Sequence, residues 1–249
     1  MNQPPPCYGI IPTRYASSRF EGKPLALILG KPMIQHVYER ARQCPHLQRV
    51  ILATDDERIF AKAQSLAIPV LMTSPDHTCG SERVLEAARL LEVPEDGVVV
   101  NIQGDEPALV PEMLTALIAP FSSPAVQVTT LARTISAEEA RDPDQVKVVM
   151  GRDNQALYFS RLPIPYPRDG REEGYFGHIG LYAFRMKTLA RFVALDKGVL
   201  EQKECLEQLR LLENHIPIQV VITTHKSHGV DRPGDIAVVE KMLSGNIRD

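Results

Sequence analysis

The sequence lacks the features that would direct it out of the cell or into a membrane. No stretch approaches about eighteen consecutive apolar residues, and the first residues show no charged region followed by an apolar run. The cysteines Cys7, Cys44, Cys79 and Cys205 are far apart and form no Cys-x-x-Cys pair. We therefore expect reduced thiols in a cytoplasmic protein that is neither secreted nor inserted into a membrane.

A large excess of charge of one sign is also missing. The 28 basic and 31 acidic side chains leave a net charge of −3, which provides no general field for attracting nucleic acid. The 249 residues contain no internal repeat, no low-complexity tract and no clear linker. We expect residues 1–249 to form one domain without a nucleic-acid partner, in which any attraction for anions is local.

Several common catalytic motifs are absent. Gly22-Lys23 is followed by Pro24 rather than Ser or Thr, and no Gly-x-Gly-x-x-Gly follows the first apolar strand. The chain has neither His-Glu-x-x-His nor Gly-x-Ser-x-Gly, and the pair His225 and His228 has no third zinc ligand nearby. These absences weaken the ATPase, dehydrogenase, zinc-enzyme and triad-hydrolase interpretations.

The pattern of apolar residues predicts an α/β fold. Short β-branched runs alternate with helical patterns through the first half, which is typical of a mainly parallel sheet covered by helices. Between about 146 and 185 the chain has strands without long helices, and such strands pair antiparallel. A long helix over 200–213, a strand over 218–224 and a helix beginning near Pro233 complete the predicted series.

A cationic loop follows the first apolar strand. Arg14, Arg19 and Lys23 lie within ten residues of each other, together with hydroxyls and Gly22. Ligands of open α/β sheets bind at the carboxyl ends of the strands, and guanidinium and ammonium groups bind phosphate. The loop therefore indicates a nucleotide enzyme.

Two carboxylates are candidate metal ligands. Asp105 follows the most apolar strand, and Asp231 lies between a strand and a helix. Magnesium in nucleotide sites takes one or two carboxylates together with substrate phosphates. The alternative for Asp105 is an ordinary turn, and the alternative for Asp231 is a helix entry, with Pro233 in the first turn.

Other polar residues have a functional and a structural interpretation. Ser81 and Arg83 open a helix and could contact a nucleotide, although Ser81 could instead cap the helix. Arg161 ends a strand and could bind a carboxylate or form a surface ion pair, while His178, Gly180 and Tyr182 alternate onto one sheet face. The predicted long helix places on one side Glu204, Glu207, Gln208 and Leu211.

Taken together, the motifs resemble those of the 3-deoxy-manno-octulosonate cytidylyltransferases, also called CMP-KDO synthetases. The resemblance runs from about residue 8 to residue 242 in order and with compatible spacing. It is carried by Arg14-Tyr15-Ala16-Ser17-Ser18-Arg19, Gly22-Lys23-Pro24, Gly30-Lys31-Pro32-Met33, Ala53-Thr54-Asp55, Gln103-Gly104-Asp105-Glu106-Pro107, Val146-Lys147-Val148-Val149, Tyr158-Phe159-Ser160-Arg161, His178-Ile179-Gly180-Leu181-Tyr182, Leu206-Glu207-Gln208-Leu209-Arg210 and Val230-Asp231-Arg232-Pro233. Thr13, Glu21 and Cys79-Gly80-Ser81 depart from the usual pattern, but Ser81 keeps a hydroxyl.

The resemblance implies a Rossmann-like nucleotidyltransferase fold, usually a homodimer, with a small antiparallel platform for dimerisation or sugar binding. It implies transfer of CMP from CTP to the anomeric hydroxyl of 3-deoxy-manno-octulosonate (KDO), with release of pyrophosphate, for lipopolysaccharide synthesis. By matching motif, the triphosphate contacts would be Arg14, Ser17, Arg19 and Lys23, and the Mg²⁺ ligands would be Asp105 and Asp231. The cytidine contacts would be Pro12, Ser81 and Arg83, and the sugar contacts would be Gln103, Arg161, His178, Tyr182, Glu207 and Gln208.

Two alternatives stay open at this point. One is the same reaction on another acidic sugar, such as 8-amino-KDO or a sialic acid. The other is a nucleotide-binding regulator that kept the fold without turnover. The second would bind CTP without magnesium-dependent release of pyrophosphate, and the presence of both candidate metal carboxylates counts against it.

Overall fold

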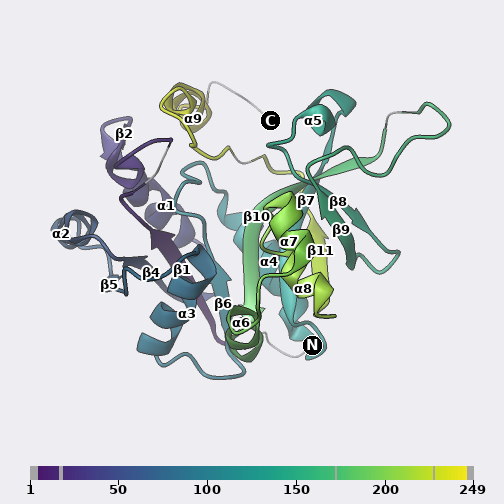
Figure 1. The fold of residues 1–249 in the computed structure, drawn as a ribbon. Coiled ribbons are helices and arrows are strands. Elements are labelled where there is room, and N and C mark those ends of the chain that lie inside the picture. The colour runs from purple at the N-terminus through teal and green to yellow at the C-terminus, as the bar shows by residue number, and fades with distance from the viewer. Residues whose placement is uncertain (1–4, 17–18, 172, 227, 246–249) are drawn as a thin grey trace.

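One mixed sheet of nine strands organises the chain in a computed structural model that describes residues 5–16, 19–171, 173–226 and 228–245. Seven strands follow the order β11-β7-β10-β6-β1-β4-β5, with β8 paired to β10 and β9 paired to β8 (Figure 1). The strands are β1 (Cys7–Thr13), β4 (Leu47–Thr54), β5 (Val70–Met72), β6 (Val98–Asn101), β7 (Val128–Ile135), β8 (Lys147–Met150), β9 (Ala156–Ser160), β10 (Tyr175–Arg185) and β11 (Ile218–Ile222). The short pair of β2 (Leu27–Ile28) and β3 (Lys31–Pro32) forms a separate hairpin.

The first half of the sheet is parallel, as the alternating pattern predicts. Strand β1 pairs in parallel with both β4 and β6, and β4 pairs in parallel with β5. Strand β10 then runs antiparallel to both β6 and β7. The carboxyl ends of β1, β4, β5 and β6 therefore share one edge, while β10 brings a long run of side chains past that edge from the other half of the sheet.

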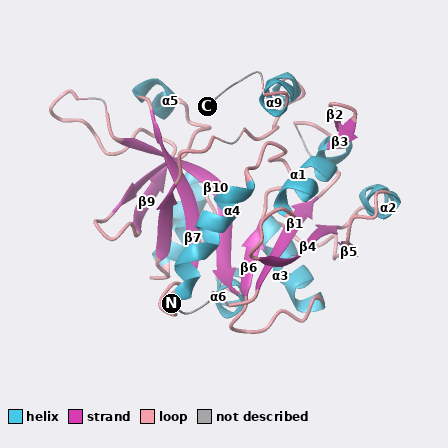
Figure 2. Ribbon diagram, turned by 180° about the vertical axis from the view of Figure 1, so that it is seen from behind, coloured by secondary structure: helices cyan, strands magenta, loops and turns pink. Residues whose placement is uncertain are grey.

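Helices cover both faces of the sheet (Figure 2). Buried side chains of α1, α2 and α4 form one apolar core with the strands, and those of α3, α6 and α8 form a second core on the opposite face. The helices are α1 (Met33–Ala41), α2 (Glu57–Ser65), α3 (Gly80–Leu90), α4 (Pro111–Ile118), α5 (Ala137–Arg141), α6 (Met186–Val193), α7 (Val199–Glu204), α8 (Leu209–Glu213) and α9 (Asp235–Leu243), with the 3-10 turns η1 (Lys23–Leu25) and η2 (Ala119–Ser122).

The predicted long helix over 200–213 is wrong. Cys205 adopts a left-handed conformation with φ of 53° and ends α7, and the chain restarts as α8 at Leu209. The break allows the two short helices to pack against each other. Arg210 of α8 then donates hydrogen bonds of 2.6 and 2.7 Å to the two carboxylate oxygens of Glu201 in α7. The residues between the helices are therefore presented on a turn rather than on a helical face.

The antiparallel subregion has the expected strands, and an unexpected helix follows the last of them. Strands β8 and β9 pair antiparallel, and β8 joins β10 at Lys147 and Gly177. Helix α5 begins with a capping box between Ser136 and Glu139. Helix α6, which follows β10 directly, was missing from the sequence prediction.

Within the described residues, no helix has both the length and the apolar character needed to cross a membrane.

Candidate active site

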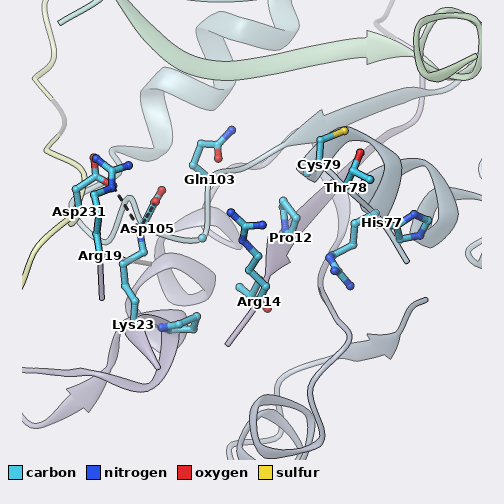
Figure 3. Close-up of a pocket in the computed structure, with 15 residues that line it drawn as sticks. Pro12, Arg14, Arg19, Lys23, His77, Thr78, Cys79, Gln103, Asp105 and Asp231 are labelled. Atoms are coloured by element: carbon cyan, nitrogen blue, oxygen red, sulfur yellow. Dashed lines mark hydrogen bonds and ion pairs between the residues drawn. The ribbon is translucent and has the colours of Figure 1, made fainter. Parts of the chain in front are cut away.

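A cavity of about 440 Å³ lies at the carboxyl ends of the parallel strands. Its walls come from the loop after β1, the segment before α3, the loop after β6 and the segment before α9. Figure 3 shows Asp105, Asp231 and Arg19 at one end of this cavity, with His77, Thr78 and Cys79 at the other. We call it the nucleotide cavity, after the ligand that the sequence predicts for its residues. Distant parts of the sequence thus converge, as the position of ligands in open α/β sheets predicts.

Lys23 lies between the two candidate metal carboxylates. Its Nζ atom donates a hydrogen bond of 2.6 Å to Oδ2 of Asp105 and lies 3.6 Å from Oδ1 of Asp231. Arg19 reaches Asp231 from the solvent side at 3.3 Å. The two carboxylates therefore share one cation, and they lie close enough together to contribute to a common site.

The backbone of the cationic loop explains how Lys23 reaches that position. Gly22 has φ of +69°, which L side chains rarely adopt, and its amide donates to the carbonyl of Tyr15. This bond closes the loop and starts η1 at Lys23. Arg14 and Pro12 also line the cavity, but Ser17 lies outside the described residues.

Arg83 lines the nucleotide cavity from a buried position. Its guanidinium donates 2.7 Å to Asp55 and 2.6 Å to the hydroxyl of Thr73, which ties α3 to the ends of β4 and β5. Because these bonds use much of its donor capacity, Arg83 supports the wall of the cavity in addition to lining it. The motif containing Asp55 was noticed in the sequence, but its pairing with Arg83 was not.

The wall of the cavity opposite Asp105 includes His77 and Thr78, which sequence reasoning missed. Two carboxylates of α3 hold this segment: Glu82 accepts 2.6 Å from the amide of Thr78, and Glu86 accepts from the amide of Ser74 and from the ring of His77. Carboxylates in the first turns of a helix that bind the preceding backbone are a recognisable capping signal. The signal was present in the spacing of Thr78 and Glu82.

A second cavity of about 200 Å³ adjoins the first, with Gln103 lining both. Gln103 is held there by a hydrogen bond of 3.1 Å from its side-chain amide to the carbonyl of Gly180. The predicted sugar contacts His178, Tyr182, Glu207 and Gln208 all line this second cavity, which we call the sugar cavity after that prediction. Asn101 is a further lining residue that the sequence analysis did not select, although it is the polar residue that ends the most apolar strand.

The sugar cavity concentrates buried polar atoms that lack partners. Among the described residues, five buried side-chain nitrogen or oxygen atoms make no hydrogen bond. Four of their residues line this cavity: Asn101, Tyr182, Glu207 and Gln208. Leaving a buried polar atom unpaired costs about 1–3 kcal/mol, so such a cluster is expected where a polar ligand supplies the missing partners.

His178 and Tyr182 are held in their uncharged forms. Desolvation lowers the pKa of His178 to about 3 and raises the pKa of Tyr182 well above its usual value. The Nε2 atom of His178 lies 2.9 Å from the hydroxyl of Thr130. At neutral pH the cavity therefore presents a neutral imidazole and a phenol, which suit hydroxyl recognition.

Two predicted residues lie elsewhere than expected. The guanidinium of Arg161 donates to the backbone carbonyls of Glu204, Pro143 and Cys205, and Arg161 lines neither cavity. Ser81 lines the sugar cavity rather than the nucleotide cavity. It does not cap α3 either, because the N-cap residue is Cys79.

The expected helical face that included Glu204 is also wrong. Glu204 accepts hydrogen bonds of 2.8 Å from the hydroxyl of Ser160 and 2.9 Å from the amide of Arg161 at the end of β9, away from the cavities. The break after α7 separates it from Glu207 and Gln208. The sequence pattern could not reveal this break, since no proline or glycine marks it.

The donor set fits a hard divalent cation. Asp105 and Asp231 supply oxygen ligands, and the position between them already favours a positive charge, that of Lys23. Among the described residues, no group of three or more His, Cys, Asp or Glu side chains could hold a metal without other ligands. Two carboxylates with the remaining ligands from phosphate and water match the coordination of Mg²⁺ rather than that of structural Zn²⁺.

Comparison with known proteins gives one consistent family. A family model described as cytidylyltransferase matches residues 8–219. The 3-deoxy-manno-octulosonate cytidylyltransferase of Oleidesulfovibrio alaskensis is 60% identical over 96% of this chain and 97% of its own length. The 8-amino-3,8-dideoxy-manno-octulosonate cytidylyltransferase of Shewanella putrefaciens is 45% identical over 95% and 98%. The solved structure of a CMP:2-keto-3-deoxy-manno-octonic acid synthetase complexed with CTP is 41% identical, covers 97% of this chain and 100% of its own, and has a TM-score of 0.92.

Proposed function

The chain belongs to the family of 3-deoxy-manno-octulosonate cytidylyltransferases, and we propose that it transfers CMP from CTP to the anomeric hydroxyl of KDO with release of pyrophosphate. The observation that carries this proposal is the pair of adjoining cavities. One has cations and carboxylates at its end, and the other has unpartnered polar atoms. Gln103 lies at the boundary, where the α-phosphate and the attacking hydroxyl would meet.

The cations of the nucleotide cavity suit binding of the triphosphate. Arg14, Arg19 and Lys23 all line the cavity, and in-line attack on the α-phosphorus builds negative charge on the departing pyrophosphate. Positioning and charge stabilisation are therefore the main tasks of these side chains, and no side-chain nucleophile is required. Ser17 is retained as a proposed contact on the strength of the motif alone.

We propose Mg²⁺ as the divalent metal, with Asp105 and Asp231 as its protein ligands. Bound there, the ion would supply positive charge to the phosphates and lower the pKa of the attacking hydroxyl. The carboxylates' own task is to hold a fixed pair of oxygens beside the cationic loop, and Asp235 supports Asp231 by accepting 2.8 Å hydrogen bonds from the amides of Asp231 and Arg232.

The sugar cavity suits an acidic sugar with several hydroxyls. Asn101, Tyr182, Glu207 and Gln208 supply acceptors and donors that have no hydrogen-bond partner among the described residues. We retain His178 and Gln103 as sugar contacts because both line the cavity. Arg161 is retained only as a proposal from its motif, since its guanidinium is held by backbone carbonyls.

We further propose a homodimer that involves β9 and the segment after it. Large apolar side chains are exposed there: Leu157 lies on the strand, Leu162 lies just beyond its end, and Tyr166 is 84% exposed. Light scattering of the purified protein would test this, with Tyr166→Asp expected to shift a dimer toward monomer. The single domain and the cytoplasmic location stay predictions, which limited proteolysis and cell fractionation would test.

A pyrophosphate-release assay with CTP, KDO and Mg²⁺ tests the proposed reaction. The same assay with 8-amino-KDO and with a sialic acid tests the choice of sugar, and we expect KDO to give the highest kcat/KM. Support for KDO comes from the 60% identical relative, whereas the relative named for the 8-amino sugar is 45% identical. A clear preference for either other sugar would overturn the substrate assignment.

A further inference from the structure

The carboxylate of Glu207 lines the sugar cavity, and its two oxygens have different partners. Oε2 accepts a hydrogen bond of 3.0 Å from the hydroxyl of Ser81. Oε1 is buried and has no hydrogen-bond partner among the described residues. Among the described residues, no cation forms an ion pair with Glu207. The nearby Arg210 binds Glu201 instead.

Ser81 belongs to a helix turn that contacts both cavities. The residues just before it, Cys79 and Gly80, line the nucleotide cavity, while Ser81 itself lines the sugar cavity and is only 3% exposed. Its hydroxyl proton is directed away from the helix backbone and toward Glu207, so the side chain does nothing to stabilise the start of α3.

The pKa of Cys79 supports this close arrangement. Burial, followed by the negative charge of Glu207, raises the pKa of the Cys79 thiol to about 12. Cys79 therefore stays a neutral thiol beside the carboxylate and offers at most a weak hydrogen bond. The Ser81 hydroxyl is the strong neutral donor available to fix the orientation of Glu207.

We propose that Ser81 is a positioning residue for the sugar. By holding Oε2 of Glu207, Ser81 turns Oε1 of the same carboxylate toward the sugar cavity. There Oε1 accepts a hydrogen bond from a hydroxyl of the acidic sugar. This inference rests on the proposed function and assigns Ser81 to the sugar rather than to cytidine. A carboxylate without a cation partner depends on its hydrogen bonds for its orientation. Without Ser81, Glu207 loses the contact that selects one rotamer.

The test compares Ser81→Ala with the conservative Ser81→Thr, using initial rates with CTP and KDO varied independently. We expect Ser81→Ala to raise the KM for KDO about tenfold, the loss of one hydrogen bond to a charged group. The KM for CTP should stay within about twofold, because the nucleotide cavity keeps its lining. Ser81→Thr should restore the KM for KDO, since it retains the hydroxyl.

Ser81→Cys provides a second variant of nearly unchanged size, with a weaker donor, and should give an intermediate KM for KDO. It decides the question if the alanine variant does not fold. A rise in the KM for CTP alone would overturn the inference and make Ser81 a nucleotide contact, and an unchanged KM for KDO in both the alanine and cysteine variants would also overturn it. The proposed function would fail differently, with wild-type protein releasing no pyrophosphate from CTP and KDO.

Discussion

The ammonium of Lys23 donates a 2.6 Å hydrogen bond to the carboxylate of Asp105, although the two residues are 82 positions apart in the sequence. The Lys23 side chain is 14% exposed and that of Asp105 is 34% exposed, so both remain accessible from the nucleotide cavity. Lys23 therefore contacts a proposed metal ligand and also lines the proposed triphosphate site. It links the metal ligands to the phosphate contacts.

Asp105→Asn is expected to lower kcat by about a hundredfold to a thousandfold, the usual cost of losing a main electrostatic element of an active site. The amide preserves the shape of the side chain but removes the negative charge that would bind Mg²⁺. Pyrophosphate release measured across a Mg²⁺ titration, with circular dichroism to check folding, tests this. Glu112→Gln, an exposed acid in the first turn of α4, is the matched control and should retain full activity. A near-normal kcat for the Asp105 variant would remove that residue from the mechanism.

Lys23→Ala is expected to lower kcat/KM for CTP by about a hundredfold or more, because a cation that stabilises the departing pyrophosphate is lost. Steady-state kinetics with CTP varied at saturating KDO measure the effect. Lys31→Ala removes a cation from an exposed pair with Glu39, outside both cavities, and should change kcat/KM little. If both lysine variants lost the same modest amount, Lys23 would contribute general charge rather than a specific phosphate contact.

The stability of the protein should depend on His178 at acidic pH. The pKa of His178 is about 3 in the folded protein, against about 6.5 in an unfolded chain, so between these values only the unfolded state takes up the proton. The free energy of unfolding therefore falls as the pH is lowered through 6.5 toward 3. From pH 7 to pH 5 this one residue lowers the free energy of unfolding by up to about 2 kcal/mol. Water in the sugar cavity would solvate the imidazole and reduce this loss.

His178→Gln tests this contribution, because a glutamine amide can replace the contact with Thr130 without titrating. Urea unfolding at pH 7 and pH 5 should show a smaller loss of stability for the variant than for the wild type. His46 is exposed, and His46→Gln should leave the difference between the two pH values unchanged. Equal losses for the wild type and the His178 variant would contradict the assigned pKa.

The contrast between predicted and observed features has a physical cause. The positions of Arg14, Lys23 and Asp105 could be predicted, because apolar strands are visible in the sequence and the residues after them must meet at one sheet edge. The local pattern was enough to predict the strands. The parallel pairing of β1 with β4 and with β6 then brings the residues after them to the same edge of the sheet. The same reasoning placed His178 and Tyr182 on one face by simple alternation along a strand.

What could not be predicted depends on contacts between distant residues. The turn between α7 and α8 arises because Cys205 adopts a left-handed conformation and Arg210 binds Glu201, and neither is encoded by a proline or a glycine. The hydrogen bond from Ser81 to Glu207 spans 126 positions, so local spacing suggested only a helix cap or a nucleotide contact. Side-chain partners of this kind require the tertiary structure.

The close approach of two loops at Gly104 leads to the last prediction. A Cβ atom at this position would lie 2.8 Å from the carbonyl oxygen of Pro12 and 2.8 Å from the Cγ2 atom of Thr13. The carbonyl belongs to the end of β1 and cannot rotate away as a side chain could. Gly104→Ala must therefore push the loop carrying Asp105 away from the end of β1, and overpacking of this kind costs about 1–3 kcal/mol.

We expect Gly104→Ala to lower the free energy of unfolding by that amount and to raise the KM for CTP, since both displaced segments line the nucleotide cavity. Urea unfolding and steady-state kinetics measure the two effects. Gly234→Ala is the matched control, because a Cβ atom there meets no neighbour and the backbone has φ of −64°. Because the strain arises where the loops meet, the KM for CTP should change more than the KM for KDO. A variant that was destabilised but kept its KM for CTP would show that the loop can shift without moving the phosphate contacts.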